Sequence, residues 1–187
     1  MKRIGIMQPY FLPYIGYFQL MNMVDEFVVY DNIQFTKKGW IHRNRMLQDS
    51  KDEYFTLPLK KDSDYLNINE RYLAESFPQE SIKVLNKIHN NYRKSPYFDE
   101  VYAVIQEVMT FSQRNLFHFI YHSLEKIKCY LELDTPLIIS SSIPINHELR
   151  GEQKVIALSK ELNATYYINP IGGLELYKKS EFKNHHL

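Results

Sequence analysis

Two short apolar runs near the N-terminus constrain the fold of this 187-residue chain more than any other feature. Residues 3–7 (RIGIM) form a run that stops at Gln8 and Pro9, and proline cannot continue a sheet ladder. A second run, residues 27–30 (FVVY), follows a segment whose apolar residues recur at helical spacing. A connection of this length between two buried strands favours a parallel pair. We therefore predict that the chain opens as strand, helix and strand in an α/β fold.

The rest of the pattern predicts a helical middle between further strands. Residues 34–51 carry five Lys or Arg side chains against one Asp, and we expect a surface loop and a short helix there. Other strands are expected at 53–59, 136–140 and 165–169, and helices at 78–93, 101–109, from 115 for about four turns, and at 152–162. Ser76 and Gln79 have the spacing of a capping box at the first of these helices. No repeat or low-complexity tract is seen, so we predict one domain over residues 1–187 with an open, mainly parallel sheet, flanking helices and a helical insertion.

Composition excludes several classes of protein. Lys and Arg total 23 against 22 for Asp and Glu, so the net charge of +1 provides no field that would attract nucleic acid or an anionic membrane. The single cysteine, Cys129, excludes an intramolecular disulfide and a metal site of several thiolates. Neither a signal peptide nor an apolar stretch of membrane-spanning length is seen. We expect a cytoplasmic, soluble protein without nucleic-acid partner or membrane insertion.

The turn after the first strand is the first candidate binding site. In open α/β sheets, ligands bind beyond the carboxyl ends of the strands. Gly16 allows close approach of the backbone. Amide and hydroxyl groups are offered to a polar ligand by four predicted substrate-binding residues: Gln8, Tyr10, Tyr14 and Tyr17. The alternative interpretation is an aromatic core turn with buried, hydrogen-bonded tyrosines.

A second candidate site begins at Asp31, where the second strand should end, beside the first turn. Asp31 could orient the imidazole of His42 for general base catalysis. Arg43, with Lys37 and Lys38, could hold phosphate or carboxylate oxygens. The alternative is a solvated basic loop with Trp40 packed beneath it.

Three weaker signals lie further along the chain. His118 and His122 are four residues apart on an expected helix, but no third ligand is near them in the sequence, so we predict no metal site. Residues 140–142 are serines after an expected strand, which line the same crevice or form a plain polar loop. Gly172 and Gly173 approach a phosphate or mark a turn.

Residues 1–46 (MKRIGIMQPYFLPYIGYFQLMNMVDEFVVYDNIQFTKKGWIHRNRM) closely resemble the WbqC-like protein family. Residues 168–182 (INPIGGLELYKKSEF) resemble the C-terminal pattern of the same family. The resemblance implies a place among genes for bacterial O-antigen and other surface polysaccharides, and a role in transferring glycine or a related acyl group to sugars. Family members usually continue past residue 187, so the resemblance also implies that a C-terminal stretch is lacking here.

A more distant similarity concerns the fold. Nucleotidyltransferases similar to pantothenate synthetase place a His-x-Gly-His motif after their first strand, and Tyr14-Ile15-Gly16-Tyr17 occupies the equivalent position here. Tyrosine has a pKa of about 10 and carries no positive charge near neutrality. The similarity implies a nucleotidyltransferase-like, or HUP-like, architecture more than it implies adenylyl transfer.

The resemblance implies a transferase of surface polysaccharide biosynthesis that passes a glycyl, aminoacyl or acyl group to an amino-sugar precursor. His42 with Asp31 would act as the base, and Arg43, Asn44 and the first turn would donate hydrogen bonds to the oxyanion. We expect a small-molecule substrate such as a nucleotide sugar, no cofactor, and a possible homodimer. The alternatives are a non-catalytic sugar-nucleotide-binding protein of the same pathway and a nucleotidyltransferase-like enzyme.

Overall fold

A computed structural model describes residues 1–48, 50–173 and 175–187. Its internal contacts divide the chain into two units. Unit 1 comprises Met1–Gln8, Tyr14–Asn32 and Leu133–Leu187. Unit 2 comprises Pro9–Pro13 and Ile33–Glu132. The single domain expected from the sequence stays a prediction.

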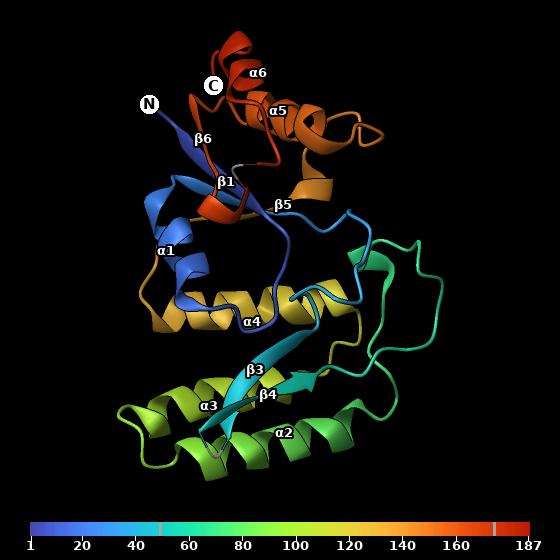
Figure 1. Ribbon diagram of the computed structural model, residues 1–187, viewed down its shortest axis with the longest axis vertical. Coiled ribbons are helices and arrows are strands. Elements are labelled where there is room, and N and C mark those ends of the chain that lie inside the picture. Colours follow the sequence, from blue (N-terminus) through green and yellow to red (C-terminus); the bar gives the residue numbers. More distant parts are fainter. Residues whose placement is uncertain (49, 174) are drawn as a thin grey trace. The chain divides into compact units, whose positions relative to one another are not determined.

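The predicted parallel sheet forms the centre of unit 1 (Figure 1). Its strands are β1 (Arg3–Met7), β2 (Glu26–Val29), β5 (Leu137–Ile139) and β6 (Tyr166–Ile168). They lie in the order β5-β2-β1-β6, and every neighbouring pair is parallel. Helix α1 (Ile15–Met23) connects β1 to β2. The prediction that the chain opens as strand, helix and parallel strand is therefore confirmed.

Helices flank both faces of this sheet. On one face, Ile4, Ile6 and Val28 pack in a core with residues of α5 (Gly151–Glu161) and α6 (Lys179–Asn184). On the other face, a Cβ atom added to Gly5 would lie 3.3 Å from the Phe27 ring and 3.6 Å from Leu20 of α1. Glycine at this position therefore leaves room for the Phe27 ring, and α1 lies on this face of the sheet. Short 3₁₀ turns follow the strands at η2 (Ser140–Ser142) and η3 (Ile171–Gly173).

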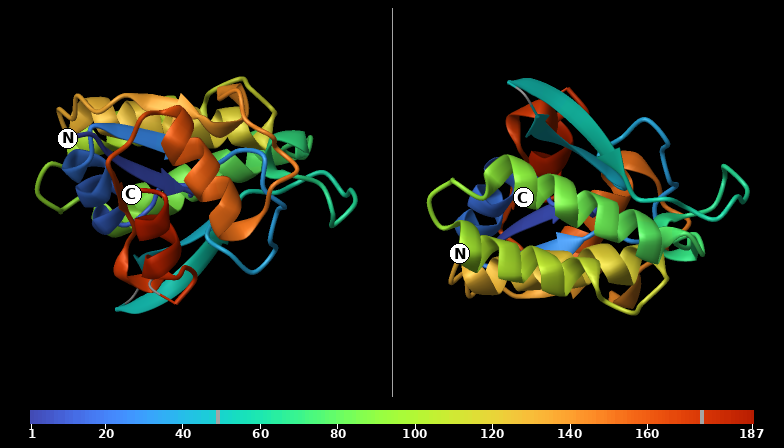
Figure 2. Two further views of the ribbon diagram at one scale, coloured as in Figure 1. Left: turned by 90° about the horizontal axis from the view of Figure 1, so that it is seen from above. Right: turned by 90° about the horizontal axis from the view of Figure 1, so that it is seen from below.

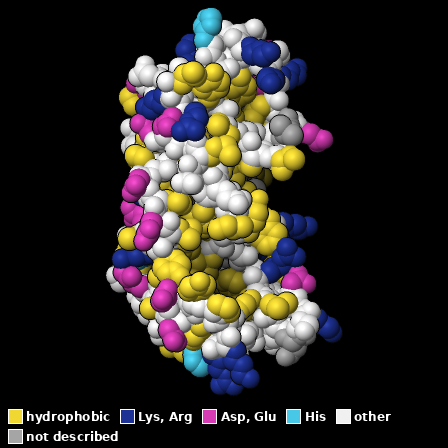
Figure 3. Space-filling model, turned by 90° about the vertical axis from the view of Figure 1, so that its left-hand side faces the viewer, with side chains coloured by type: hydrophobic (Ala, Val, Ile, Leu, Met, Phe, Trp, Pro, Cys, Tyr) yellow, Lys and Arg dark blue, Asp and Glu magenta, His cyan; other side chains and the backbone are white. Residues whose placement is uncertain are grey.

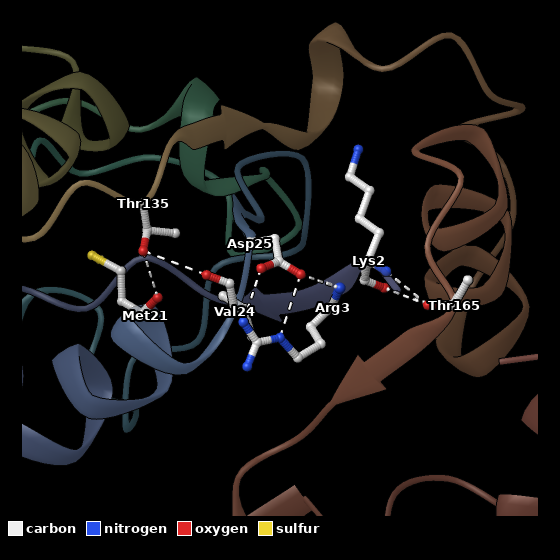
Figure 4. Close-up of polar contacts among 7 residues, drawn as sticks. All are labelled: Lys2, Arg3, Met21, Val24, Asp25, Thr135 and Thr165. Atoms are coloured by element: carbon white, nitrogen blue, oxygen red, sulfur yellow. Dashed lines mark hydrogen bonds and ion pairs between the residues drawn. The ribbon is translucent and has the colours of Figure 1, made fainter.

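Polar contacts hold the start of β1 in place (Figure 4). The Arg3 backbone N–H donates to Asp25 Oδ2 at 2.7 Å, and the Arg3 Nη2 donates to Asp25 Oδ1 at 2.9 Å. The Lys2 N–H donates to Thr165 Oγ1 at 2.8 Å, next to β6. The Thr135 hydroxyl donates at 2.9 Å to a carbonyl in the last turn of α1. These bonds fix the amino-terminal edge of the sheet.

The Asp25 contacts give the first testable prediction. Hydrogen bonds from the Arg3 side chain and backbone lower the pKa of Asp25 from 3.8 to about 2. The stabilising contribution of this carboxylate is therefore present above pH 3.8 and is lost as the pH falls toward 2. Arg3→Ala is expected to raise the Asp25 pKa toward 3.8, measured by NMR titration of the side-chain carboxyl, with Arg45→Ala as the control. A wild-type Asp25 that titrates near pH 4 contradicts this prediction.

Unit 2 combines a hairpin with three helices. Strands β3 (Arg43–Gln48) and β4 (Lys51–Thr56) pair antiparallel. Helices α2 (Phe77–Tyr92) and α3 (Phe98–Met109) lie side by side, and α3 lies beside α4 (Leu116–Tyr130) (Figure 2). A short 3₁₀ turn, η1 (Ile68–Glu70), precedes α2. The core includes ring contacts of Phe11 with Phe55 at 6.1 Å and with Phe119 at 5.8 Å. The predicted helical middle is confirmed.

Two local predictions are wrong. Residues 43–48 form strand β3 instead of the expected loop and short helix, because Met46 points inward while Arg43, Arg45 and Leu47 line the outer face, a strand alternation that the charge obscures. The Ser76 side chain makes no capping hydrogen bond, although α2 does begin directly after it. Pro78, in the first turn of α2, has a fixed φ that suits a helix start without that bond.

On the face drawn in Figure 3, Lys and Arg are scattered and form no continuous basic patch. None of the helices in the described part of the chain has both the length and the apolar character needed to cross a membrane.

Candidate functional site

Polar side chains gather in unit 1 where β2 and β5 end. Asp31 and Asn32 follow β2, and Ser140 follows β5 directly. The carboxyl ends of parallel strands meet at one edge of the sheet, where ligands of open α/β folds bind. His147 and Lys154 join these three residues through hydrogen bonds. We call these five residues the Asp31 cluster.

Ser140 lies at the centre of the Asp31 cluster. Its side chain is fully buried, and Asp31 is only 2% exposed. The Ser140 hydroxyl donates to Asp31 Oδ1 at 2.7 Å and lies 2.9 Å from Asn32 Oδ1, so these two acceptors share one hydrogen. The Asp31 N–H donates back to Ser140 Oγ at 3.2 Å, and the Ser141 N–H donates to Asp31 Oδ1 at 2.9 Å. The segment after β2 and the segment after β5 are thus joined. The buried carboxylate of Asp31 is hydrogen-bonded, as burial of a charge requires.

The tautomer of His147 follows from its neighbours. Nε2 lies 3.0 Å from the Ile143 carbonyl oxygen, which can only accept, so Nε2 carries the hydrogen. Nδ1 lies 2.9 Å from Asn32 Nδ2 and accepts its hydrogen. Both ring nitrogens are therefore engaged, and His147 holds its loop against the one that follows β2.

Lys154 places a buried cation in the same cluster. Its side chain is 4% exposed, and Nζ donates to the His147 carbonyl at 3.1 Å and to the Asn32 carbonyl at 3.4 Å. Burial lowers the pKa of Lys154, while the charge of Asp31 opposes that change. The Lys154 ammonium also lies 5.2 Å from the centre of the Tyr30 ring, and burial raises the pKa of Tyr30 to about 12. The cluster therefore shapes the edge of the sheet with hydrogen bonds and opposite charges.

The predicted first-turn residues of unit 1 differ in their surroundings. Tyr17 is 3% exposed, packs 5.2 Å from the Phe27 ring, and donates its hydroxyl to the Gln8 carbonyl at 3.1 Å. This agrees with the alternative of an aromatic core turn. Tyr14 is 77% exposed, and a Cβ atom at Gly16 would collide with its hydroxyl. Gly16 thus makes room for the Tyr14 ring, and a ligand at these residues stays a prediction.

In unit 2, Asn44 fastens the turn that contains Tyr10. Its Nδ2 donates to the Phe11 carbonyl at 3.0 Å and also to the Leu12 carbonyl. Leu12 has a φ of 47°, a left-handed conformation that costs a non-glycine residue energy. Tyr10 is half-buried, and burial raises its pKa. Asn44 is thus a positioning residue for this turn.

Replacing Asn44 with alanine should therefore destabilise the protein. The change removes both donors and leaves two carbonyls unpaired beside a strained residue, so we expect a loss of about 1–2 kcal/mol in the free energy of unfolding, measured with urea. Thr56→Ala, at an exposed position of the same hairpin, is the control and should change it by less than about 0.5 kcal/mol. An equal effect of the two substitutions would argue against the fastening role of Asn44.

His42 has an unused ring nitrogen. The ring packs edge-on against Phe35 with centroids 5.0 Å apart, and Nδ1 is buried without a hydrogen-bond partner among the residues that the structure describes. Burial, followed by the charges of Arg43 and Arg71, lowers the pKa of His42 to about 4. Near neutral pH the imidazole is therefore uncharged. Its predicted pairing with Asp31 joins residues of different units and stays a prediction.

Arg71 and Trp40 are two further features of this part of unit 2. Arg71 is 4% exposed, donates from Nη1 to the Ser63 carbonyl at 2.8 Å, and stacks 5.0 Å from the Phe35 ring. No sequence pattern marked Arg71 as buried, because it lies in a polar connection. Trp40 is 38% exposed, so part of its ring is open to solvent.

The predicted cations have different partners. Lys37 pairs with Asp64 at 2.7 Å, with both side chains exposed. Lys38 is exposed, and its carbonyl accepts from Arg43 Nη2. Arg43 Nε donates to the Gly39 carbonyl at 3.0 Å, and its guanidinium lies 5.2 Å from the centre of the Tyr54 ring. Arg43 is therefore part of a surface stack with aromatic rings.

The histidine pair of α4 packs on aromatic rings. His122 stacks on Phe111 with ring centroids 3.8 Å apart, and His118 lies 5.4 Å from the Phe117 ring. Over residues 1–48, 50–173 and 175–187, no three His, Cys, Asp or Glu side chains are grouped so that they could hold a metal ion.

Comparison with known proteins relates this chain to a protein family. The model of the WbqC-like protein family matches residues 8–187. A curated relative, the uncharacterized protein Rv1507c of Mycobacterium tuberculosis, is 40% identical over 60 residues, which are 32% of this chain. The match spans 26% of that relative, about a quarter of its length. No solved structure matches.

Proposed function

The chain belongs to the WbqC-like protein family, and from this premise we propose that it is a transferase of surface polysaccharide, or O-antigen, biosynthesis. It would pass a glycyl, aminoacyl or acyl group to the amine of a sugar precursor. The resemblance stated above supports the pathway. Polar side chains at the carboxyl ends of the parallel strands support the part of the proposal that concerns a small polar substrate.

One observation carries this proposal: a polar side chain follows each of the four parallel strands near its carboxyl end, beginning with Gln8 after β1. Asn32 follows β2, Ser140 follows β5, and Asn169 follows β6. Asn169 Nδ2 donates to the Gly173 carbonyl at 2.8 Å, which orders the turn after β6. The amide groups of Asn32 and Asn169, which are partly exposed, are suited to the hydroxyl groups of a sugar, whereas the buried Ser140 orders the segments at this edge. In the nucleotidyltransferase-like architecture proposed from the sequence, the substrate would bind at this edge.

The proposed reaction forms a bond between the sugar nitrogen and the acyl carbon and breaks the bond from that carbon to its leaving group. The amine proton leaves through a base, and the leaving group departs with the electron pair. His42 is our candidate for the base, because its Nδ1 has no partner among the described residues. Arg43 would donate to the oxyanion. Asp31, already engaged by Ser140 and Ser141, would position the loops.

A binding protein of the same pathway is the second candidate, and one observation favours it. The Ser140 hydroxyl is fully buried, and both ring nitrogens of His147 are engaged, so neither is a free nucleophile or base. The nucleotidyltransferase-like alternative has less support. The Tyr17 hydroxyl, at the place of a phosphate-binding histidine, donates to the Gln8 carbonyl.

A two-step experiment tests these candidates. Thermal shifts are first measured against nucleotide sugars, aminoacyl donors and adenosine nucleotides, because saturable binding raises the melting temperature. Any stabilising sugar is then incubated with the donors, and the products are analysed by mass spectrometry. A transferase gives a sugar of increased mass. Stabilisation without product supports the binding protein, and a response confined to adenosine nucleotides supports the nucleotidyltransferase alternative.

A further inference from the structure

The outer face of the β3–β4 hairpin carries a stack of aromatic rings and guanidinium groups. Arg43 and Arg45 lie on this face of β3, and Tyr54 of β4 is directly opposite Arg45 in the register. The Trp40 ring, from the preceding loop, stacks with the Tyr54 ring at 6.1 Å and an interplanar angle of 18°. We call these four residues the Trp40 platform.

Both guanidinium groups adjoin both rings. The Arg43 Cζ lies 5.2 Å from the centre of the Tyr54 ring and 5.8 Å from that of Trp40. The Arg45 Cζ lies 5.2 Å from the centre of the Trp40 ring and 5.9 Å from that of Tyr54. Trp40 is nevertheless 38% exposed and Tyr54 50% exposed. The arginines therefore hold two nearly parallel rings in place and leave much of their surface in water.

The charge of the platform is positive. Arg45 pairs with Asp52 at 3.0 Å, with both side chains about half exposed. The Arg43 guanidinium donates to two backbone carbonyls, of Gly39 and Lys38, which use two of its five N–H donors and do not neutralise its charge. The face thus combines a stacking surface with an unneutralised cation, and its complement is a planar ring joined to an anion.

We propose that the Trp40 platform binds a nucleoside diphosphate. The base stacks on the exposed surface of the Trp40 and Tyr54 rings, and the diphosphate accepts hydrogen bonds from Arg43 and Arg45. This inference rests on the proposed function, because it assigns a binding surface to the nucleotide half of an activated sugar. It adds a binding surface for the nucleotide and two residues, Arg45 and Tyr54, that the sequence did not single out.

Other ligand classes fit the face less well. Single-stranded nucleic acid is bound by basic grooves that follow its backbone, whereas this chain has a net charge of +1. An anionic membrane would have to accept the carboxylate of Asp52 and the hydroxyl of Thr56, both exposed at this hairpin. A nucleoside diphosphate needs only an aromatic surface on which its base can stack and cations that bind its phosphates, and the Trp40 platform has both.

Trp40 is the single tryptophan of the chain, so its fluorescence reports directly on the platform. We expect UDP, GDP or ADP to quench Trp40 emission with saturation. Tyr54→Ala and Arg45→Gln should each raise the dissociation constant tenfold or more. Leu47→Ala, an exposed position on the same face of β3, is the matched control and should change it less than twofold. Uridine alone and inorganic pyrophosphate alone should each bind more weakly than UDP.

Several outcomes would overturn the inference. Quenching that is absent, or that is unchanged in both Tyr54→Ala and Arg45→Gln, would show that the stack only stabilises the hairpin. Stronger quenching by oligothymidylate or by vesicles of anionic phospholipid than by UDP would assign the platform to another ligand class. Circular dichroism of each variant checks that it is folded.

The failure of this inference can be told apart from that of the proposed function. If the wild-type chain forms a modified nucleotide sugar and Tyr54→Ala retains its full kcat/KM, the function stands and the platform assignment fails. If UDP binds at the platform but no donor and sugar give a product, the platform assignment stands and the transferase fails.

Discussion

Asp31→Ala is expected to lower the free energy of unfolding by about 3 kcal/mol, one of the largest effects of any single substitution in this chain. The Asp31 carboxylate is 2% exposed and accepts hydrogen bonds from the Ser140 hydroxyl and the Ser141 N–H. Its removal leaves both donors without this acceptor and leaves the buried ammonium of Lys154 without the nearby negative charge. Urea unfolding followed by circular dichroism measures the loss.

Two companion substitutions separate the causes of this loss. Asp31→Asn keeps an oxygen acceptor but removes the charge, so its effect should lie between those of wild type and Asp31→Ala. Lys154→Met removes the buried cation, and combining it with Asp31→Asn should cost less than the sum of the two single changes. Ser141→Ala is the control, because Ser141 is exposed and its donor to Asp31 is the backbone N–H. A loss below about 1 kcal/mol for Asp31→Ala would mean that the cluster does not stabilise the fold.

The sequence predicted the position of Asp31 and, as one of two alternatives, serines 140–142 in the same crevice, but it predicted none of the hydrogen bonds of the Asp31 cluster. A polar residue after a short apolar run marks the carboxyl end of a strand, and Asp31 does follow β2. Ser140 lies 109 residues further on, and Lys154 lies 122 residues beyond Asn32. Contacts this distant in the sequence depend on the order of strands in the sheet, which local spacing does not contain. One feature of the sequence did indicate a buried lysine. Lys154 adjoins Val155 and precedes Leu158 by four residues, so it falls on the buried face of α5.

Tyr14 and Tyr17 show why side-chain exposure was hard to predict. Both lie in one aromatic segment and were assigned the same role. Helix α1 begins at Ile15, so Tyr14 precedes the helix with an extended backbone and is exposed. Tyr17 lies within α1 and faces the Phe27 ring. One residue of difference in the helix boundary thus decides which tyrosine is buried, and boundaries are the least certain part of a pattern.

The basic segment after Asp31 concealed a strand for a different reason. Arginine counts as polar in a periodicity analysis, so Arg43 and Arg45 resemble a solvated loop. In the structure their guanidinium groups lie against the Trp40 and Tyr54 rings, which lets long charged side chains cover apolar surface. The alternation of β3 was present in the sequence, but its outer face is aromatic and cationic instead of plainly polar.

His42→Gln is expected to lower kcat of the proposed acyl transfer by a hundredfold or more, the usual scale for loss of a general base. Glutamine keeps a polar group of similar length but cannot take up the amine proton. His118→Gln is the matched control, because His118 is exposed on α4, and it should leave kcat within about twofold of wild type. Wild-type turnover in His42→Gln would exclude this histidine as the base.

The pH dependence of the reaction gives a second test of His42 as the general base. Burial and the charges of Arg43 and Arg71 lower the pKa of His42 from 6.5 to about 4, so the ring is unprotonated from neutral pH down to about 5. An acid limb of kcat/KM that belongs to His42 should therefore lie near pH 4 and not near 6.5. An anion bound at Arg43 would offset part of the positive charge around the ring and raise the pKa of His42, which NMR titration with and without pyrophosphate measures. A His42 pKa that stays fixed while pyrophosphate saturates Arg43 would show that the bound anion does not change the charge around this imidazole, and the Arg43 charge would then not be a cause of the lowered pKa.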